Sequence, residues 1–195
     1  MRTACILIVV LALTALPAWC SGMESAEQRA LAAYARAALL HRIGIADQPV
    51  APQVAQTIQR ACFVTFFHNG KVFACFGGFS PRTASLADEV RENIRLALKN
   101  DPRARQITPE QATDSQVQIT LPGLLQRISS LRTLDPSRHG LFVEAPDGNG
   151  VAIVPGEAKT AAYALRSALA RLGLTGDAKD VRLYRFSATV IRDQQ

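Results

Sequence analysis

The sequence predicts an α+β protein with mainly antiparallel sheets, and three observations lead to this class. Helix-like and strand-like segments are mixed along the chain, two pairs of strand-like segments are joined by turn dipeptides, and a long strand-like segment closes the chain. Strands joined by such short turns run antiparallel. With 195 residues, the chain is long enough for one ordinary domain or for two small lobes that share a core.

Three segments have the apolar spacing of amphipathic helices. The first covers residues 25–43 and ends at Gly44, a natural helix stop. The second follows a candidate cap at Ser85, with acidic residues early and basic residues late, and ends before Pro102. The third is expected over residues 157–172.

A central hairpin is predicted around Asn69 and Gly70, because this dipeptide between two apolar runs favours a type I′ turn. Both faces of the two runs are apolar, so the hairpin is expected to be covered on both sides. The resulting register pairs His68 with Lys71, Phe66 with Phe73, Val64 with Cys75, and Cys62 with Gly77.

Three further strand regions follow. Residues 116–121 alternate between polar and apolar, which predicts a half-buried strand that ends at Pro122. A second hairpin is expected over residues 141–154, and a long strand over residues 181–191. Residues 103–114 are predicted to form a polar loop.

The first 22 residues have the layout of a secretory signal peptide. Arg2 gives a positive start, and the apolar stretch at residues 4–16 has 13 residues, fewer than the ~20 that span a bilayer. The mature domain is therefore expected to be residues 23–195, exported to the periplasm or the extracellular space. Two alternatives remain open: an uncleaved leader that anchors the protein, and lipidation at Cys20, near the break in the leader.

The distribution of charged residues, histidines and cysteines limits the kinds of partner that the protein is expected to bind. Removal of residues 1–22 lowers the net charge from +6 to +5, and the basic residues are spread among acidic ones. Nucleic-acid binders concentrate such charge in a patch, so a small molecule or a protein is the expected partner. The scattered histidines and the lack of a C-x-x-C motif predict no metal site. No cofactor is expected. Membrane contact is expected only if the leader is uncleaved or Cys20 is lipidated.

Six sequence runs follow one another in a familiar order: CFVTFFHNGKVFACFGG, KNDPRARQITPEQ, SRHGLFVE, VAIVPGEA, ARLGL and VRLYRFSATVI. Together they resemble the AMMECR domain family from about residue 25 to the C-terminus. The resemblance implies two small α/β lobes that flank a cleft, in a family without an established activity.

The chain departs from the family pattern at several polar positions. The family signature Leu-Arg-Gly-Cys-Ile-Gly corresponds to the run VFACFG, which keeps Cys75 and Gly77. Phe73 replaces the arginine, Ala74 replaces the first glycine, and Gly156 stands where the family has a glutamine. The chain therefore resembles an exported and partly degenerate member.

Cys75 has three interpretations. The favoured one is a small buried hydrophobic residue. The second is a nucleophile, which needs a base or cation nearby to form the thiolate; His139 is the candidate catalytic partner. The third is a disulfide with Cys62, which would exclude catalysis. The predicted register places the two cysteines diagonally on one face, a marginal spacing for a bridge.

Thr65, Arg103 and Arg138 are the candidate ligand-binding residues. The guanidinium group of Arg103 could hold an anionic substrate group. Two functions are therefore weighed. The favoured one is a non-catalytic binding or scaffold module that retains the cleft. The alternative is a cysteine-dependent envelope enzyme that uses Cys75 between the lobes.

Overall fold

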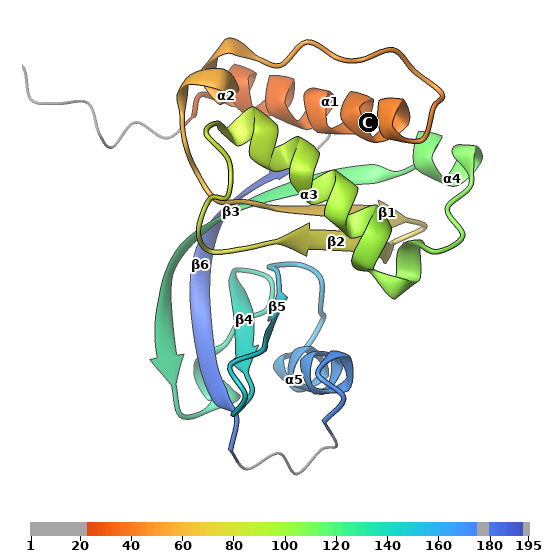
Figure 1. Cartoon of the computed structure of the whole chain (residues 1–195). Coiled ribbons are helices and arrows are strands. Elements are labelled where there is room, and N and C mark those ends of the chain that lie inside the picture. The colour runs from red at the N-terminus through yellow and green to blue at the C-terminus, as the bar shows by residue number, and fades with distance from the viewer. Residues whose placement is uncertain (1–22, 175–179, 193–195) are drawn as a thin grey trace, which may run out of the picture.

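The computed structural model describes residues 23–174 and 180–192, so the expected leader at residues 1–22 lies outside the described residues. One curled six-stranded sheet forms the centre of the molecule, and every pair of neighbouring strands is antiparallel (Figure 1). The predicted α+β class is confirmed. In spatial order, the strands are β2 (Lys71–Gly77), β1 (Phe63–His68), β3 (Gln116–Ile128), β6 (Arg182–Arg192), β4 (His139–Glu144) and β5 (Gly150–Ile153).

On one side of the sheet, helix α3 (Leu86–Asn100) packs on β1 and β2, and α1 (Ser25–Arg42) packs on β3 and β6 and against α3, with α2 (Gln53–Thr57) beside α3 (Figure 1). Both long helices were predicted. The hydroxyl of Ser85 accepts a hydrogen bond from the Asp88 amide at 3.1 Å and so caps α3. The short α4 (Pro109–Thr113) was not predicted, and it falls in the expected polar loop.

The second layer is formed by α5 (Ala161–Arg171), which packs on β4 and β5 and closes its own cluster of buried residues. This helix begins later than predicted, because Thr160 caps it: its hydroxyl accepts from the Tyr163 amide at 3.1 Å. Strands β3 and β6 extend through both halves (Figure 1), so the two lobes share one sheet. In the described ranges, no helix is long and apolar enough to cross a membrane.

The register of the β1–β2 hairpin differs from the prediction. Asn69 and Gly70 have positive φ of 52° and 71°, as a type I′ turn requires. Phe73 is then an extra residue, a β-bulge that shifts all later pairs by one position. Cys75 therefore pairs with Thr65, not with Val64 as the sequence predicted.

The predicted end of β3 at Pro122 is also wrong. The strand continues to Ile128, and its pairing with β6 is interrupted only by a bulge between Pro122 and Leu125. A bulge releases the ladder position where proline has no N–H to donate, so the strand can pass through Pro122. This continuation is what carries the sheet from one lobe into the other.

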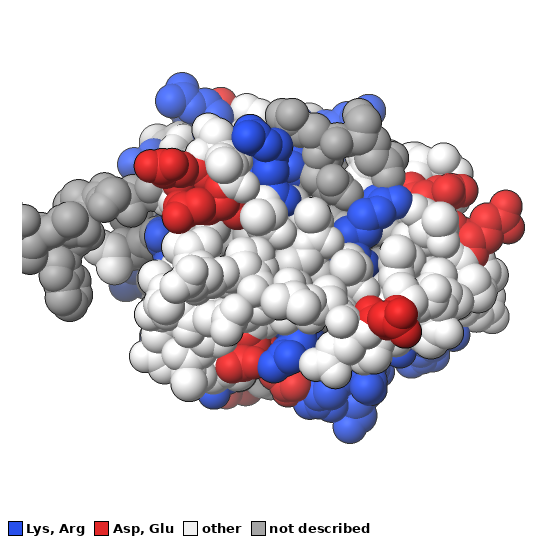
Figure 2. Space-filling model, turned by 90° about the horizontal axis from the view of Figure 1, so that it is seen from above, with Lys and Arg blue, Asp and Glu red and all other residues white. Residues whose placement is uncertain are grey.

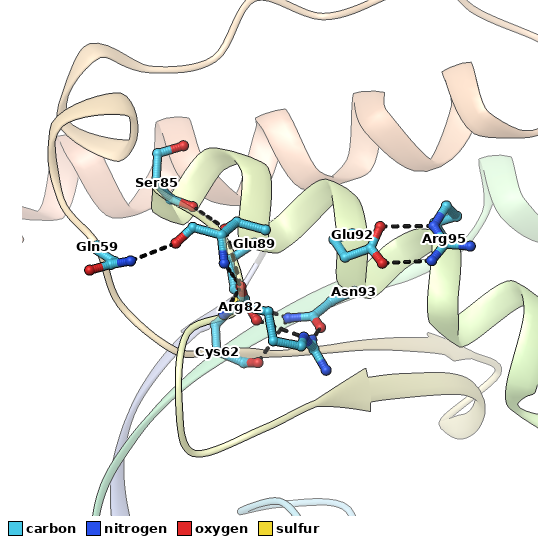
Figure 3. A network of polar contacts seen from close by, with 9 residues as sticks. Gln59, Cys62, Arg82, Ser85, Glu89, Glu92, Asn93 and Arg95 are labelled. Carbon is cyan, nitrogen blue, oxygen red and sulfur yellow. Dashed lines mark hydrogen bonds and ion pairs between the residues drawn. The ribbon is translucent and has the colours of Figure 1, made fainter.

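A buried carboxylate holds the loop that follows β2 against α3 (Figure 3). The side chain of Glu89 is fully buried and accepts hydrogen bonds from the Arg82 amide (2.8 Å) and guanidinium (3.0 Å) and from Thr83. One turn along α3, the Asn93 amide donates to the carbonyl oxygen of Cys62 at 2.9 Å. Because every partner of the buried charge is supplied, the loop is fixed to both α3 and β1.

Aromatic rings fill the inside of the curl where the two halves meet. Phe79, held there by the fixed loop, makes edge-to-face contacts with Phe63, Phe142 and Phe186 at centroid distances of 5.2, 5.2 and 5.0 Å. These rings come from β1, β4 and β6, so the cluster joins the two lobes.

Candidate functional site

Cys75 lies on β2 on the inner side of the curl, with its thiol turned away from the helices. The Thr65 hydroxyl is 3.1 Å from Sγ, and Thr65 is fully buried. The backbone N–H of Cys75 donates to Oδ2 of Asp101 at 2.9 Å. A side chain thus satisfies an amide on the outer edge of β2, where no strand of the described part of the chain is paired.

The surroundings of Cys75 keep the thiol protonated. Burial raises the pKa of Cys75 to about 12, and the nearby Glu157 carboxylate acts in the same direction. The Thr65 hydrogen bond and the charges of Arg103 and Arg171 lower this pKa, but they are outweighed. A reactive cysteine needs the opposite balance, with cations and hydrogen bonds dominating.

A chain of ion pairs runs beside Cys75 and connects the two lobes. The Arg103 guanidinium donates to both oxygens of Asp101, with Nη2 at 2.7 Å from Oδ2, and Nη1 lies 3.2 Å from Oε1 of Glu157. Arg171 of α5 contacts the same Glu157 oxygen at 2.5 Å. Both carboxylates are buried, and both arginines keep about a third of their side-chain surface. The segment after α3 is thereby tied to α5.

Two pockets meet at this chain of ion pairs, and both are lined by Arg103 and Arg171. The smaller has a volume of about 350 Å³, lies between β2 and β5, and includes Cys75 and Phe63 in its wall. The larger has a volume of about 720 Å³ and lies between the β1–β2 turn and α5. We call the two together the inter-lobe groove.

A polar row crosses the inner face of the sheet from Cys75. Thr65, Gln118 and Arg192 occupy successive paired positions on β1, β3 and β6. The Gln118 side chain donates to the Pro155 carbonyl at 3.1 Å and accepts from Nε of Arg192 at 3.0 Å. Gln118 is only 1% exposed, so its hydrogen bonds link the sheet to the segment before α5.

Gln118 and its neighbour Thr120 were missed by the sequence reasoning. The alternation over residues 116–121 predicted a strand with one polar, exposed face, whereas both polar side chains are buried. The sheet curls, and the segment before α5 covers the second face. A threonine and a glutamine at alternate positions were the only local signal, and solvated faces carry the same residues.

The candidate residues from the sequence separate into two groups. Cys75 and Thr65 are in contact, and Arg103 lines the same pocket as Cys75. His139 lies at the start of β4, where its Nδ1 accepts from the Asp135 amide at 3.3 Å. Neither His139 nor Arg138, which is exposed, is among the described residues that line the groove.

The disulfide between Cys62 and Cys75, the third interpretation from the sequence, is not formed: these two cysteines are free. Cys62 is fully buried under α3, where Asn93 approaches its sulfur at 3.3 Å, and burial raises its pKa to about 12. The bulge at Phe73 is the physical reason, because it moves Cys75 to the face opposite Cys62.

Comparison with known proteins shows the family to which the chain belongs. The AMMECR1 family profile matches residues 26–191, well over half of the chain. The chain belongs to the AMMECR1 family. A Thermotoga maritima protein whose name states no function is 28% identical over 127 residues, which cover 64% of this chain and 73% of that protein.

The uncharacterized protein PH0010 from Pyrococcus horikoshii has a similar crystal structure, with a TM-score of 0.67. Its sequence is 18% identical, and the match covers 86% of this chain and 92% of that one. At this identity, the likeness concerns the fold alone. The residues of the inter-lobe groove all lie within the segment that matches the AMMECR1 family.

Proposed function

We propose that this AMMECR1-family protein is a non-catalytic binding module of the cell envelope, with a small-molecule ligand in the inter-lobe groove. The observation that carries the proposal is the larger pocket of about 720 Å³ between the β1–β2 turn and α5. Small-molecule sites usually enclose roughly 300–1,000 Å³ and lie where two structural units meet. The ion pair between Arg103 and Glu157 links the two sides of the groove, which supports a groove that is already formed before a ligand binds.

The protonated thiol supports binding over catalysis. A nucleophilic cysteine needs a general base within hydrogen-bond reach, and the group at 3.1 Å from Sγ of Cys75 is the Thr65 hydroxyl. Among the described residues that line the groove there is no histidine. The cysteine-dependent enzyme therefore lacks the neighbours that its mechanism requires.

Thiol labelling tests this choice. Native protein would be treated with iodoacetamide at a series of pH values, and adducts would be mapped by mass spectrometry. We expect Cys75 to stay unlabelled through neutral pH and to label fully in denaturant. Ser80→Cys supplies a control thiol at an exposed position close in sequence, and it should label in the native protein. Labelling of Cys75 with a midpoint below that of the control would overturn the binding module in favour of the enzyme.

The envelope location rests on the leader-like residues 1–22. Expression of the full chain in a bacterium, followed by cell fractionation and intact mass measurement, would test it. A mature protein that begins near residue 23 in the periplasmic fraction is the expected result. A diacylated Cys20 would instead indicate a membrane-attached lipoprotein, and an intact chain in the cytoplasm would contradict export.

A further inference from the structure

The larger pocket of the groove has a strongly unbalanced set of charges. Five of the described residues that line it are basic, and Glu157 is the acidic one. The basic residues come from both lobes: one from the first position of β2, one from the segment after α3, and three from α5 and the residues just before it. They are Lys71, Arg103, Lys159, Arg166 and Arg171.

Three of these cations have no carboxylate partner among the described residues. Arg103 and Arg171 share Glu157, but no ion pair involves Lys71, Lys159 or Arg166. The face over the helices differs: basic and acidic residues stand near one another there, around a mostly uncharged centre (Figure 2). Like charges held around one concave space repel each other and attract anions, which they concentrate in it.

The start of α5 adds to this positive field. Thr160, its cap, and Tyr163 line the pocket, and the first turn of the helix carries no acidic residue. The first turn of α3, in contrast, has Asp88 and Glu89 to offset the same end of its dipole. No acidic residue of the first turn offsets the positive end of the α5 dipole, so a bound anionic group can take this role.

Apart from Thr160 and Ser167, the rest of the pocket wall is apolar or aromatic. Phe67 and Val72 of the hairpin and Ile153 of β5 contribute side chains to it, and the Tyr163 ring is half exposed. The Arg166 guanidinium lies over that ring, 5.7 Å from its centroid. An apolar wall beside a group of cations fits a ligand that has both an anionic group and a hydrophobic body.

We propose that the larger pocket binds a small organic anion, with phosphate or clustered carboxylate groups held by Lys71, Lys159 and Arg166 and an apolar body against the hairpin. This inference rests on the proposed binding function and gives its ligand a chemical class. The fixed pair of arginines on Glu157 forms the base of the site, and the three unpaired cations supply the charge that remains to be neutralised.

Amide shifts in a ¹⁵N-labelled, assigned sample would test the proposal, with calorimetry to measure affinity. The probes are inorganic pyrophosphate, phenyl phosphate, citrate and the uncharged benzyl alcohol. We expect anions to shift the amides of Lys71, Thr160 and Tyr163, and raising the salt from about 0.05 M to about 0.5 M to weaken binding. A response to the two phosphates alone or to citrate alone identifies the anionic group, and either supports the proposal.

A double variant, Lys159→Gln with Arg166→Gln, should weaken anion binding about tenfold, because it removes two charged donors. Arg132→Gln is the matched control: Arg132 is exposed and is not among the residues that line the groove, so affinity should not change. Equal loss in both variants would overturn the proposal.

The other outcomes separate the ligand class from the binding function. If benzyl alcohol shifts the groove amides and no anion does, the groove binds neutral molecules; the anion proposal fails and the binding module stands. Anions that shift amides only outside the groove overturn the anion site. If none of the four probes shifts the amides of the groove, the anion proposal is contradicted. Thiol labelling then decides the proposed function independently.

Discussion

The backbone amide of Cys75 donates a hydrogen bond of 2.9 Å to Oδ2 of Asp101, across 26 positions of sequence. The same carboxylate accepts from the backbone amide and the guanidinium of Arg103. One buried side chain therefore closes the edge of β2 and orients the arginine that lines both pockets. The edge of the sheet and the base of the groove are fixed together.

We expect Asp101→Ala to destabilise the protein by about 3 kcal/mol. The substitution removes a carboxylate that is 6% exposed and leaves the Cys75 amide and part of the Arg103 guanidinium without their acceptor. Removal of one partner of a buried pair costs this much because the other partner stays desolvated. Urea unfolding followed by circular dichroism would measure the change.

Glu92→Gln is the matched control for this prediction. Glu92 also forms a two-fold hydrogen-bonded pair with an arginine, Arg95, but both side chains are about a third exposed and lie on the outside of α3. Exposed pairs contribute little to stability, so the unfolding midpoint should hardly move. A similar loss in both variants would mean that burial at Asp101 is not the cause.

Acid should remove the contribution of Asp101. Burial raises its pKa, but hydrogen bonds from Arg103 and Cys75 and the arginine charge outweigh burial and hold the pKa below its usual range. A carboxyl group with a lowered folded-state pKa stabilises the protein above the unfolded pKa of ~3.9 and loses this effect as the pH falls. Between pH ~5 and ~2, the stability of wild type should fall more steeply than that of Asp101→Asn; parallel curves would contradict this.

The hairpin shows why part of the site could be predicted from the sequence. The turn depends on two adjacent residues, Asn69 and Gly70, and it was predicted correctly. The bulge at Phe73 depends on tertiary packing: its ring stacks on Phe66, with centroids 5.8 Å apart, against the helix-side core. No local pattern marks that preference, so the face of Cys75 was assigned wrongly.

The ion pairs of the groove could not be predicted from the sequence, for a related reason. Arg103 was a candidate, but its partner Glu157 lies 54 positions away, and Arg171 was expected only as part of a helix. They meet because β3 and β6 continue past the bulge at Pro122 and bring the two halves together. Contacts of this kind depend on the curl of the whole sheet.

Alkali should destabilise the protein through the thiols of Cys62 and Cys75. Burial raises the pKa of both Cys62 and Cys75 to about 12, so the folded state keeps protons that the unfolded state releases above its pKa of ~8.5. Stability is then complete below pH ~8.5 and falls as the pH rises toward 12. In reducing buffer, Cys75→Ser should lose one of the two contributions, so its stability should fall less steeply with pH. An unchanged slope would mean that the Cys75 thiol ionises freely in the folded protein.

Gly77→Ala tests the close approach at the end of β2, and we expect a loss of about 3 kcal/mol or a failure to fold. A Cβ atom there would lie 2.4 Å from the Cys62 carbonyl oxygen and 2.4 Å from the Phe63 Cα, both backbone atoms of the paired strand. Backbone cannot yield as a flexible side chain can, so β1 would have to move. At the next position, Gly78→Ala meets nothing nearer than 3.8 Å and should change stability by less than about 0.5 kcal/mol. Equal effects at the two glycines in urea unfolding would show that lost backbone freedom, rather than strand contact, requires glycine in this stretch.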